Sequence, residues 1–140
     1  MIIRPELLRA AEGGGPSSLP PIQPRPALVF SWGPGALIQP VVAQLVIPSY
    51  IVAYFSAVAG TGGNATAAAT GSAVFSVSYV RSGITTAIGN VTWGAGSKVP
   101  TMPGVIVALQ PGDIVIATSP NPPDGTLADP MFTVAAIQTQ

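Results

Sequence analysis

Cysteine and histidine are absent from this chain of 140 residues, and charged residues make up only 7% of it. Without cysteine and histidine the chain cannot form a disulfide, a Cys/His zinc site, a cysteine nucleophile or a histidine-dependent catalytic triad. Ordinary soluble domains carry about 25% charged residues, so most of the usual charge is missing. Five Lys and Arg balance five Asp and Glu, which leaves no basic stripe for nucleic-acid phosphates.

Long uninterrupted hydrophobic runs are also absent, although 48% of the residues are hydrophobic and the mean hydropathy is +0.54. The longest apolar stretches, 41–47 and 51–58, are broken by Gln44, Pro48 and Ser56. A membrane-spanning helix needs about 20 consecutive apolar residues, so we expect no membrane partner. Residues 1–11 hold three charged residues and therefore do not resemble a signal peptide, which predicts a protein used without export.

A high hydropathy with zero net charge favours association between copies, because little charge repulsion opposes contact. The length fits one domain of the usual 100–150 residues or so. The prediction is therefore a subunit whose surface is largely buried in an assembly. The alternative is a monomer with a large core and a surface of serine, threonine and glycine.

Charge and proline divide the chain near Pro26. Half of the charged residues and six of the 16 prolines lie in residues 1–26, which we interpret as an anchoring arm. Residues 5–12 are typical of a short helix that begins at Pro5 and is stopped by glycines. Residues 16–26 favour an extended polyproline conformation. We expect the arm to bind another protein through its apolar residues and one arginine, namely Ile2, Ile3, Leu7, Leu8, Leu19, Ile22 and Arg25; the alternative is a disordered tail.

Residues 27–140 have the pattern of an all-β domain, with short runs of valine, isoleucine, threonine and aromatics between turn residues. Two long loops are expected, at 61–71 and 119–126. Because no helical segment separates the runs, the pattern predicts antiparallel strands in a sandwich or barrel. Eight strands are predicted, at 28–32, 41–47, 51–59, 73–82, 84–93, 105–109, 113–118 and 131–138.

Turn residues specify several connections in this domain. Ser82-Gly83 predicts a tight hairpin, since glycine accepts a positive φ. Gly89, followed by asparagine, interrupts the alternation of the next strand and predicts a bulge. Pro111-Gly112 has the signature of a type II turn. The residues expected to face the core in the strand after the hairpin are Ile88, Val91 and Trp93.

Only three acidic residues follow residue 26, and they are the candidates for chemistry: Asp113, Asp124 and Asp129. Asp124 and Asp129 could bring oxygens towards a calcium ion, and Asp113 with either could form the carboxylate pair of a glycosidase. The simpler interpretation is that each carboxylate stabilises a turn. With so few acid–base groups we predict no enzyme activity, no metal and no cofactor.

Aromatic side chains are too few to predict a sugar-binding platform. Aromatics at strand positions usually pack. We therefore expect core or interface positions for all five candidates, which are Trp32, Trp93, Tyr50, Tyr54 and Tyr79.

Four motifs occur in an order that resembles a recurrent module of tailed-bacteriophage virions. They are 70–79 (TGSAVFSVSY) leading to Gly83, 88–97 (IGNVTWGAGS), 109–116 (LQPGDIVI) and 120–129 (PNPPDGTLAD). The resemblance covers about residues 50–137 and departs from the module at 78–81, where an asparagine is usual before the hairpin glycine.

The resemblance implies an antiparallel jelly-roll-like β-sandwich of about eight strands, found in phage fibres, spikes and head decoration proteins, usually as homotrimers without catalysis. The expected function is a capsid decoration or cement protein, or a head-fibre-base subunit, in virions assembled in the host cytoplasm. Residues 1–26 would attach it to the major capsid protein or another virion protein. The alternative is a tail-fibre or spike domain that binds a host-surface glycan. Neither resemblance nor composition excludes a non-viral sandwich of lectin or TNF type.

Overall fold

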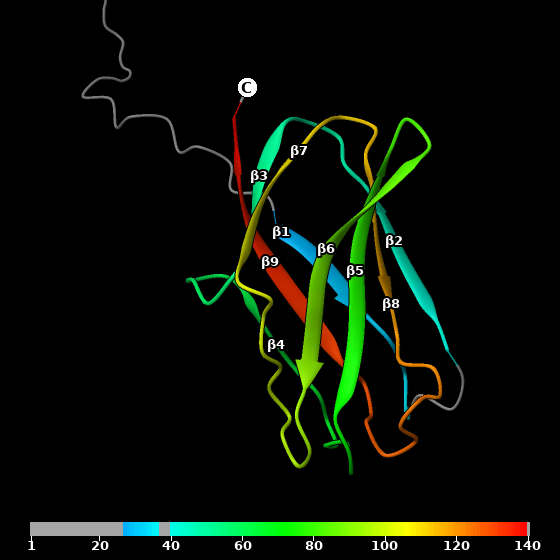
Figure 1. The fold of residues 1–140 in the computed structure, drawn as a ribbon. Coiled ribbons are helices and arrows are strands. Elements are labelled where there is room, and N and C mark those ends of the chain that lie inside the picture. The colour runs from blue at the N-terminus through cyan, green and yellow to red at the C-terminus, as the bar shows by residue number, and fades with distance from the viewer. Residues whose placement is uncertain (1–26, 37–39, 140) are drawn as a thin grey trace, which may run out of the picture.

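The computed structural model describes residues 27–36 and 40–139, and this part of the chain is all-β (Figure 1). It contains no helix long and apolar enough to cross a membrane. The nine strands are β1 (Ala27–Ser31), β2 (Val42–Val46), β3 (Ile51–Phe55), β4 (Gly62–Asn64), β5 (Ala73–Arg81), β6 (Ile84–Trp93), β7 (Val105–Leu109), β8 (Ile114–Thr118) and β9 (Met131–Gln138). The arm predicted over residues 1–26, with its short helix, lies outside the described residues.

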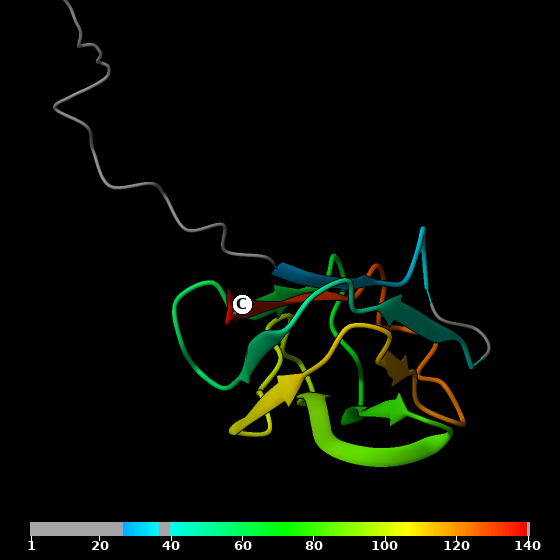
Figure 2. The same cartoon turned by 90° about the horizontal axis from the view of Figure 1, so that it is seen from above.

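The strands form two antiparallel sheets that face each other. One sheet has the order β1-β9-β3-β7, with β4 also paired to β9, and the other has the order β2-β8-β5-β6. Figure 2 shows the two layers, with β1 and β9 (blue and red) on one side and the β5–β6 hairpin (green) on the other. Strands distant in the chain, such as β1 and β9, are therefore neighbours. This order is that of a jelly roll, so the predicted fold class is confirmed.

Alternation along the strands explains why the two sheets pack together. In β5, Phe75 and Val77 are fully buried or nearly so, while Ser76 between them is exposed, as expected when successive side chains face opposite sides of a sheet. The core is an aromatic cluster drawn from both sheets. Phe132 of β9 stacks on Phe30 with 5.0 Å between ring centroids, and it lies 6.5 Å from Trp93 of β6 in the opposite sheet. These rings join the two layers.

The two turns predicted from the sequence, at Ser82-Gly83 and at Pro111-Gly112, are present in the structure. Ser82 and Gly83 both have positive φ, 51° and 78°, in the turn that joins β5 to β6. Gly112 has a φ of 89°, the value for the third residue of a type II turn. The bulge is also present, but the unmatched residue is Ile88, because Val77 pairs with Gly89 and the next residue pairs with Ala87.

Two expectations about residues 51–71 are wrong. The strand predicted to continue to residue 59 ends at Phe55, because the chain then turns: the N–H of Val58 bonds to the carbonyl of Ser56 at 2.8 Å. The region predicted as a loop contains the short strand β4, which pairs with β9. Gly62 and Gly63 disfavour strands by composition, so β4 exists only because β9 provides its partner.

Candidate functional site

The seven residues predicted to bind a partner all belong to the arm, and they lie outside the described residues. They are Ile2, Ile3, Leu7, Leu8, Leu19, Ile22 and Arg25. The predicted anchoring surface therefore remains a prediction. What the structure does place are the three acidic residues, the aromatic residues and the two outer sheet faces of the domain.

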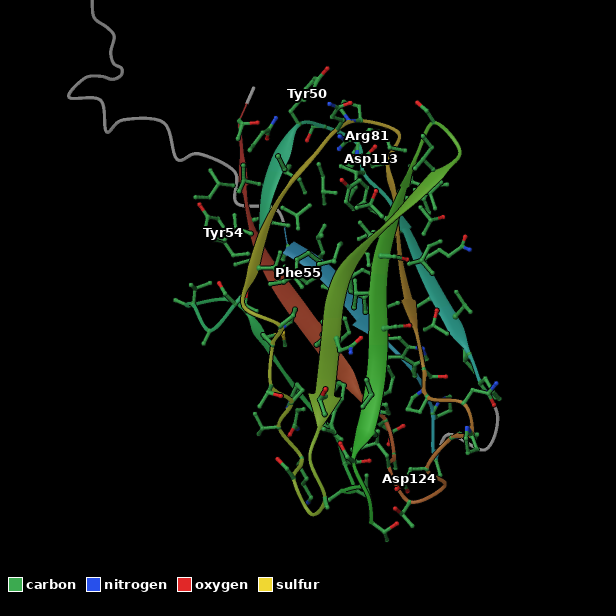
Figure 3. All side chains as sticks on the ribbon, in the orientation of Figure 1. Tyr50, Tyr54, Phe55, Arg81, Asp113 and Asp124 are labelled. Atoms are coloured by element: carbon green, nitrogen blue, oxygen red, sulfur yellow. The ribbon has the colours of Figure 1, made fainter. Side chains whose placement is uncertain are left out.

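Asp113 is buried and forms an ion pair with Arg81 at one end of the sandwich (Figure 3). The Arg81 Nη2 donates to the Asp113 Oδ2 at 2.6 Å, the Nε donates to the Oδ1 at 3.0 Å, and the Gln110 N–H donates to the Oδ2 at 2.8 Å. Arg81 also donates to the carbonyl of Ala108 at 3.2 Å. Since Arg81 ends β5 and Ala108 belongs to β7, this arginine connects the two sheets. Its hydrogen bonds hold the pKa of Asp113 below its usual value.

Asp124 lies at the opposite end of the sandwich, where it joins two loops (Figure 3). One carboxylate oxygen accepts hydrogen bonds from the hydroxyl and N–H of Thr126, and the other accepts from the Thr70 hydroxyl at 3.2 Å and the Gly71 N–H at 3.1 Å. These donors, above all the Thr126 hydroxyl, lower the pKa of Asp124 well below its usual value. The carboxylate therefore connects the loop before β5 to the loop before β9.

Asp129 has a similar role with different partners. Its oxygens accept from the Thr66 hydroxyl and from the Gly35 N–H, each at 2.6 Å. The Thr66 hydroxyl is the main reason that the pKa of Asp129 is lowered. Its backbone has a φ of 49°, a conformation that aspartate tolerates in turns.

The carboxylates are thus occupied as hydrogen-bond acceptors for turns and loops. Asp124 and Asp129 accept from different residues, and no group of three or more acidic residues that could hold a metal ion exists within residues 27–36 and 40–139. The hydrogen bonds of all three carboxylates agree with the simpler interpretation of the sequence, in which each carboxylate stabilises a turn. The geometry can order loops, and it holds each carboxyl group in its charged form at neutral pH.

The five aromatic residues named from the sequence separate into two groups. Trp32 and Trp93 are buried in the core, and Tyr79 packs against it, which confirms the expectation for these three. Tyr50 is 43% exposed at the end of the sandwich, and Tyr54 lies on an outer sheet face (Figure 3).

The outer faces of both sheets carry no charged side chain among the described residues. Of the charged residues after residue 26, Arg81 and Asp113 pair at one end of the sandwich, and the other three lie in loops. On the β2-β8-β5-β6 sheet the outward residues include Ser76, Thr118 and Ile116. A face usually exposed to water would carry charged residues in such positions.

The outer face of the β1-β9-β3-β7 sheet is the more apolar of the two. The strand register places two rows side by side across it. The first row consists of Ala27, Ala135, Tyr54 and Ile106, and the second consists of Ile137, Val52 and Ala108. We call these seven residues the apolar face. Ile106 is 61% exposed and Ile137 is 44% exposed.

A hollow of about 520 Å³ lies at the β1 side of the apolar face. Its floor includes Ala27, Tyr54, Ala135 and Ile137, and residues 58–60 of the turn after β3 form its wall. This turn stands out from the sandwich at the left of Figures 1 and 2. The Thr61 hydroxyl holds it in place by donating to the Tyr54 carbonyl and accepting from the Ala135 N–H, both at 2.8 Å. Every residue that lines the hollow is uncharged.

The chain matches no known protein-family model and no curated protein sequence. Its candidate site therefore rests on the geometry. The sequence indicated an uncharged surface, but it did not locate the apolar face. The alternation in 131–137 was a usable signal, since Thr133, Ala135 and Ile137 alternate with residues of the core. What was missing was the register that aligns three strands.

Proposed function

We propose that this protein is a non-enzymatic structural subunit of a tailed-bacteriophage virion. It is a capsid decoration or cement protein, or a head-fibre-base subunit, that assembles with its own copies through its uncharged sheet faces. Residues 1–26 attach it to the major capsid protein or to another virion protein. The hydrogen bonding of Asp113, Asp124 and Asp129 supports a structural role, because these carboxylates stabilise turns and loops.

The observation that carries the self-assembly is the apolar face. Seven uncharged residues cover the neighbouring outward positions of four strands, and one of them, Ile106, is 61% exposed. A contiguous apolar surface without charge favours burial against another protein. Because neither partner carries a charge there, two copies can meet without the cost of burying unpaired ions.

Two further features support the virion part of the proposal. The fold is a jelly roll, which is common among viral capsid proteins. The motifs that resemble the phage module also fall on strands and turns of the sandwich: 70–79 runs into β5, 88–97 covers the end of β6, and 109–116 is the turn from β7 into β8. The arm adds a means of attachment, since a weak contact repeated over a lattice gives firm binding.

The self-assembly is tested by analytical ultracentrifugation of the full chain with two matched variants. Ile106→Lys adds a charge to the apolar face, whereas Val99→Lys adds the same charge at a position of similar exposure, 59%, in the loop before β7. We expect an oligomer for the unmodified chain and for Val99→Lys, and dissociation for Ile106→Lys. A monomeric unmodified chain at high concentration would refute the self-assembly.

The virion part is tested by cosedimentation of the full chain with phage heads that lack it. We expect binding that a Leu7→Asp, Leu8→Asp double variant loses while its oligomeric state is unchanged. Undiminished binding of this variant would refute attachment through the arm, and binding to no virion component would refute the virion role. Binding of the full chain to a glycan array would favour the spike or tail-fibre alternative instead.

A further inference from the structure

The hollow begins at the point where the preceding part of the chain enters the described domain. Ala27, the first residue of β1, lines the hollow itself. In the register of β1 with β9, Ala27 lies opposite Ala135, and Ala135 lies opposite Tyr54 on β3. The floor of the hollow therefore extends from β1 across β9 to β3. Residues directly upstream of Ala27 therefore adjoin the hollow through the chain itself.

The residues immediately before Ala27 do not suit a continued strand. Extending the β1 register upstream would place Pro26 opposite Ala136 and Pro24 opposite Gln138. Proline has no N–H to donate to a β-ladder. A proline-rich segment reaching this sheet would therefore contact its outer face through side chains rather than extend its edge.

The chemistry of the preceding segment fits the hollow. Residues 13–24 carry no charge, and residues 19–22 read Leu-Pro-Pro-Ile. Proline-rich segments bind apolar grooves lined by aromatic residues, because a preformed extended conformation loses little entropy on docking. The hollow provides such a surface in Tyr54, with Ala135 and Ile137 beside it and no charged side chain in its lining.

The chain length also permits this contact. Five residue steps separate Ile22 from Ala27, and an extended chain spans up to about 3.5 Å per residue, or roughly 17 Å. Crossing from β1 to β3 means crossing two strand spacings of about 4.8 Å each, or roughly 10 Å. Residues 19–22 can therefore lie over Tyr54 of the same molecule.

We propose that the hollow on the outer face of β1, β9 and β3 binds residues 19–22 of the same chain. The contact buries Leu19 and Ile22 against Tyr54 and the wall at residues 58–60. It covers the β1 side of the apolar face and leaves Val52, Ile106 and Ala108, on the β3–β7 side, for contact with another copy. It also fixes the base of the arm on the domain, so that within residues 1–26 the attachment to a partner is made by residues 1–18, at a lower entropy cost. This contact does not depend on the virion role and is tested separately from it.

The test uses a nitroxide label and the backbone amide signals of the full chain. Because the chain has no cysteine, Ser18→Cys provides a single labelling position beside residues 19–22. We expect the amide signals of Ala59, Gly60 and Ala135 to lose most of their intensity when the label is paramagnetic. The signal of Gly125, in the loop before β9, serves as the internal reference and should keep its intensity.

Matched variants examine each side of the contact in the labelled chain. Ala59→Asp places a charge in the wall of the hollow, whereas Ala57→Asp places the same charge in the same turn, at an exposed residue that does not line the hollow. We expect Ala59→Asp to restore the lost signals and Ala57→Asp to leave them broadened. A Leu19→Ser, Ile22→Ser double variant should also restore them while the rest of the spectrum keeps its folded pattern.

Three results would overturn the proposal. The first is no signal loss around the hollow in the labelled, unmodified chain, which would leave the hollow to a second copy or another partner. The second is equal behaviour of Ala59→Asp and Ala57→Asp. The third comes from a mixture of isotope-labelled chains without nitroxide and unlabelled chains with it: signal loss at Ala135 there would mean that the segment occupies a neighbouring copy.

Discussion

Asp113→Asn is the substitution whose effect the structure specifies most closely. Asp113 is 2% exposed, and its carboxylate accepts three hydrogen bonds from Arg81, at 2.6, 3.0 and 3.2 Å, and one from the Gln110 N–H at 2.8 Å. Asparagine has the same shape, but its NH₂ group must face a guanidinium or backbone donor in place of one oxygen. The substitution therefore removes a charge-assisted interaction and leaves donors without an acceptor.

The expected loss follows from these contacts. A hydrogen bond to a charged group contributes about 1.5–3 kcal/mol, and breaking a buried ion pair costs about 3–5 kcal/mol. The Arg81 side chain is 34% exposed, so water can replace part of what it loses. We therefore expect Asp113→Asn to lower the free energy of unfolding by about 2–3 kcal/mol, or the Tm by about 10 °C.

The assay is urea unfolding of both proteins followed by tryptophan fluorescence at several pH values. The Arg81 hydrogen bonds lower the pKa of Asp113 in the folded state from its ordinary 3.8. Its stabilisation is therefore complete above pH 3.8 and is lost as the pH falls through the folded-state value. The difference between the two proteins should be constant from pH 7 to pH 5 and shrink below pH 4. A difference that stays the same down to pH 3, or no difference at pH 7, would refute the reasoning.

Three further predictions concern other parts of the fold. Asp124→Asn should speed hydrogen exchange of the Thr126 amide measured by NMR, because that N–H donates to the Asp124 carboxylate at 2.9 Å; unchanged protection would contradict the loop contact. Phe132→Ala, at a fully buried ring in the aromatic cluster, should cost about 3–5 kcal/mol in denaturant unfolding and reduce the near-ultraviolet circular dichroism. Gly63→Ala should lower the free energy of unfolding by about 1–3 kcal/mol. The added Cβ would collide with the carbonyl oxygen of Met131 and lie 2.9 Å from the Phe132 Cβ. Gly62→Ala, with nothing within 4 Å, should be much milder, and equal losses for the two would disprove the close approach.

Much of the fold was predictable from local patterns. Eight strands lie where runs of β-branched and aromatic residues were bounded by turn residues, because alternation and turn chemistry act over a few neighbouring positions. Ile88, Val91 and Trp93 were expected in the core and are buried there. β4 was not predictable, since Gly62 and Gly63 have no local preference for a strand and acquire one only by pairing with β9.

The candidate site was less predictable than the fold. The ion pair of Arg81 and Asp113 joins residues 32 positions apart, and nothing near either residue in the sequence indicates the other. The apolar face has the same origin: Ala27, Ala135, Tyr54 and Ile106 form one row only because four strands pair in one register. The contribution of each residue to a surface depends on its neighbours across the sheet.

By itself, then, the sequence determined the class of fold, the turns and the scarcity of charge, because these depend on residue type and on spacing over a few positions. It also determined that cysteine and histidine chemistry is excluded. The tertiary structure alone decided which strands are neighbours, which carboxylates stabilise which loops and where the uncharged residues gather. The physical reason is that pairing between strands distant in the chain sets those contacts, and that pairing is a property of the whole folded domain.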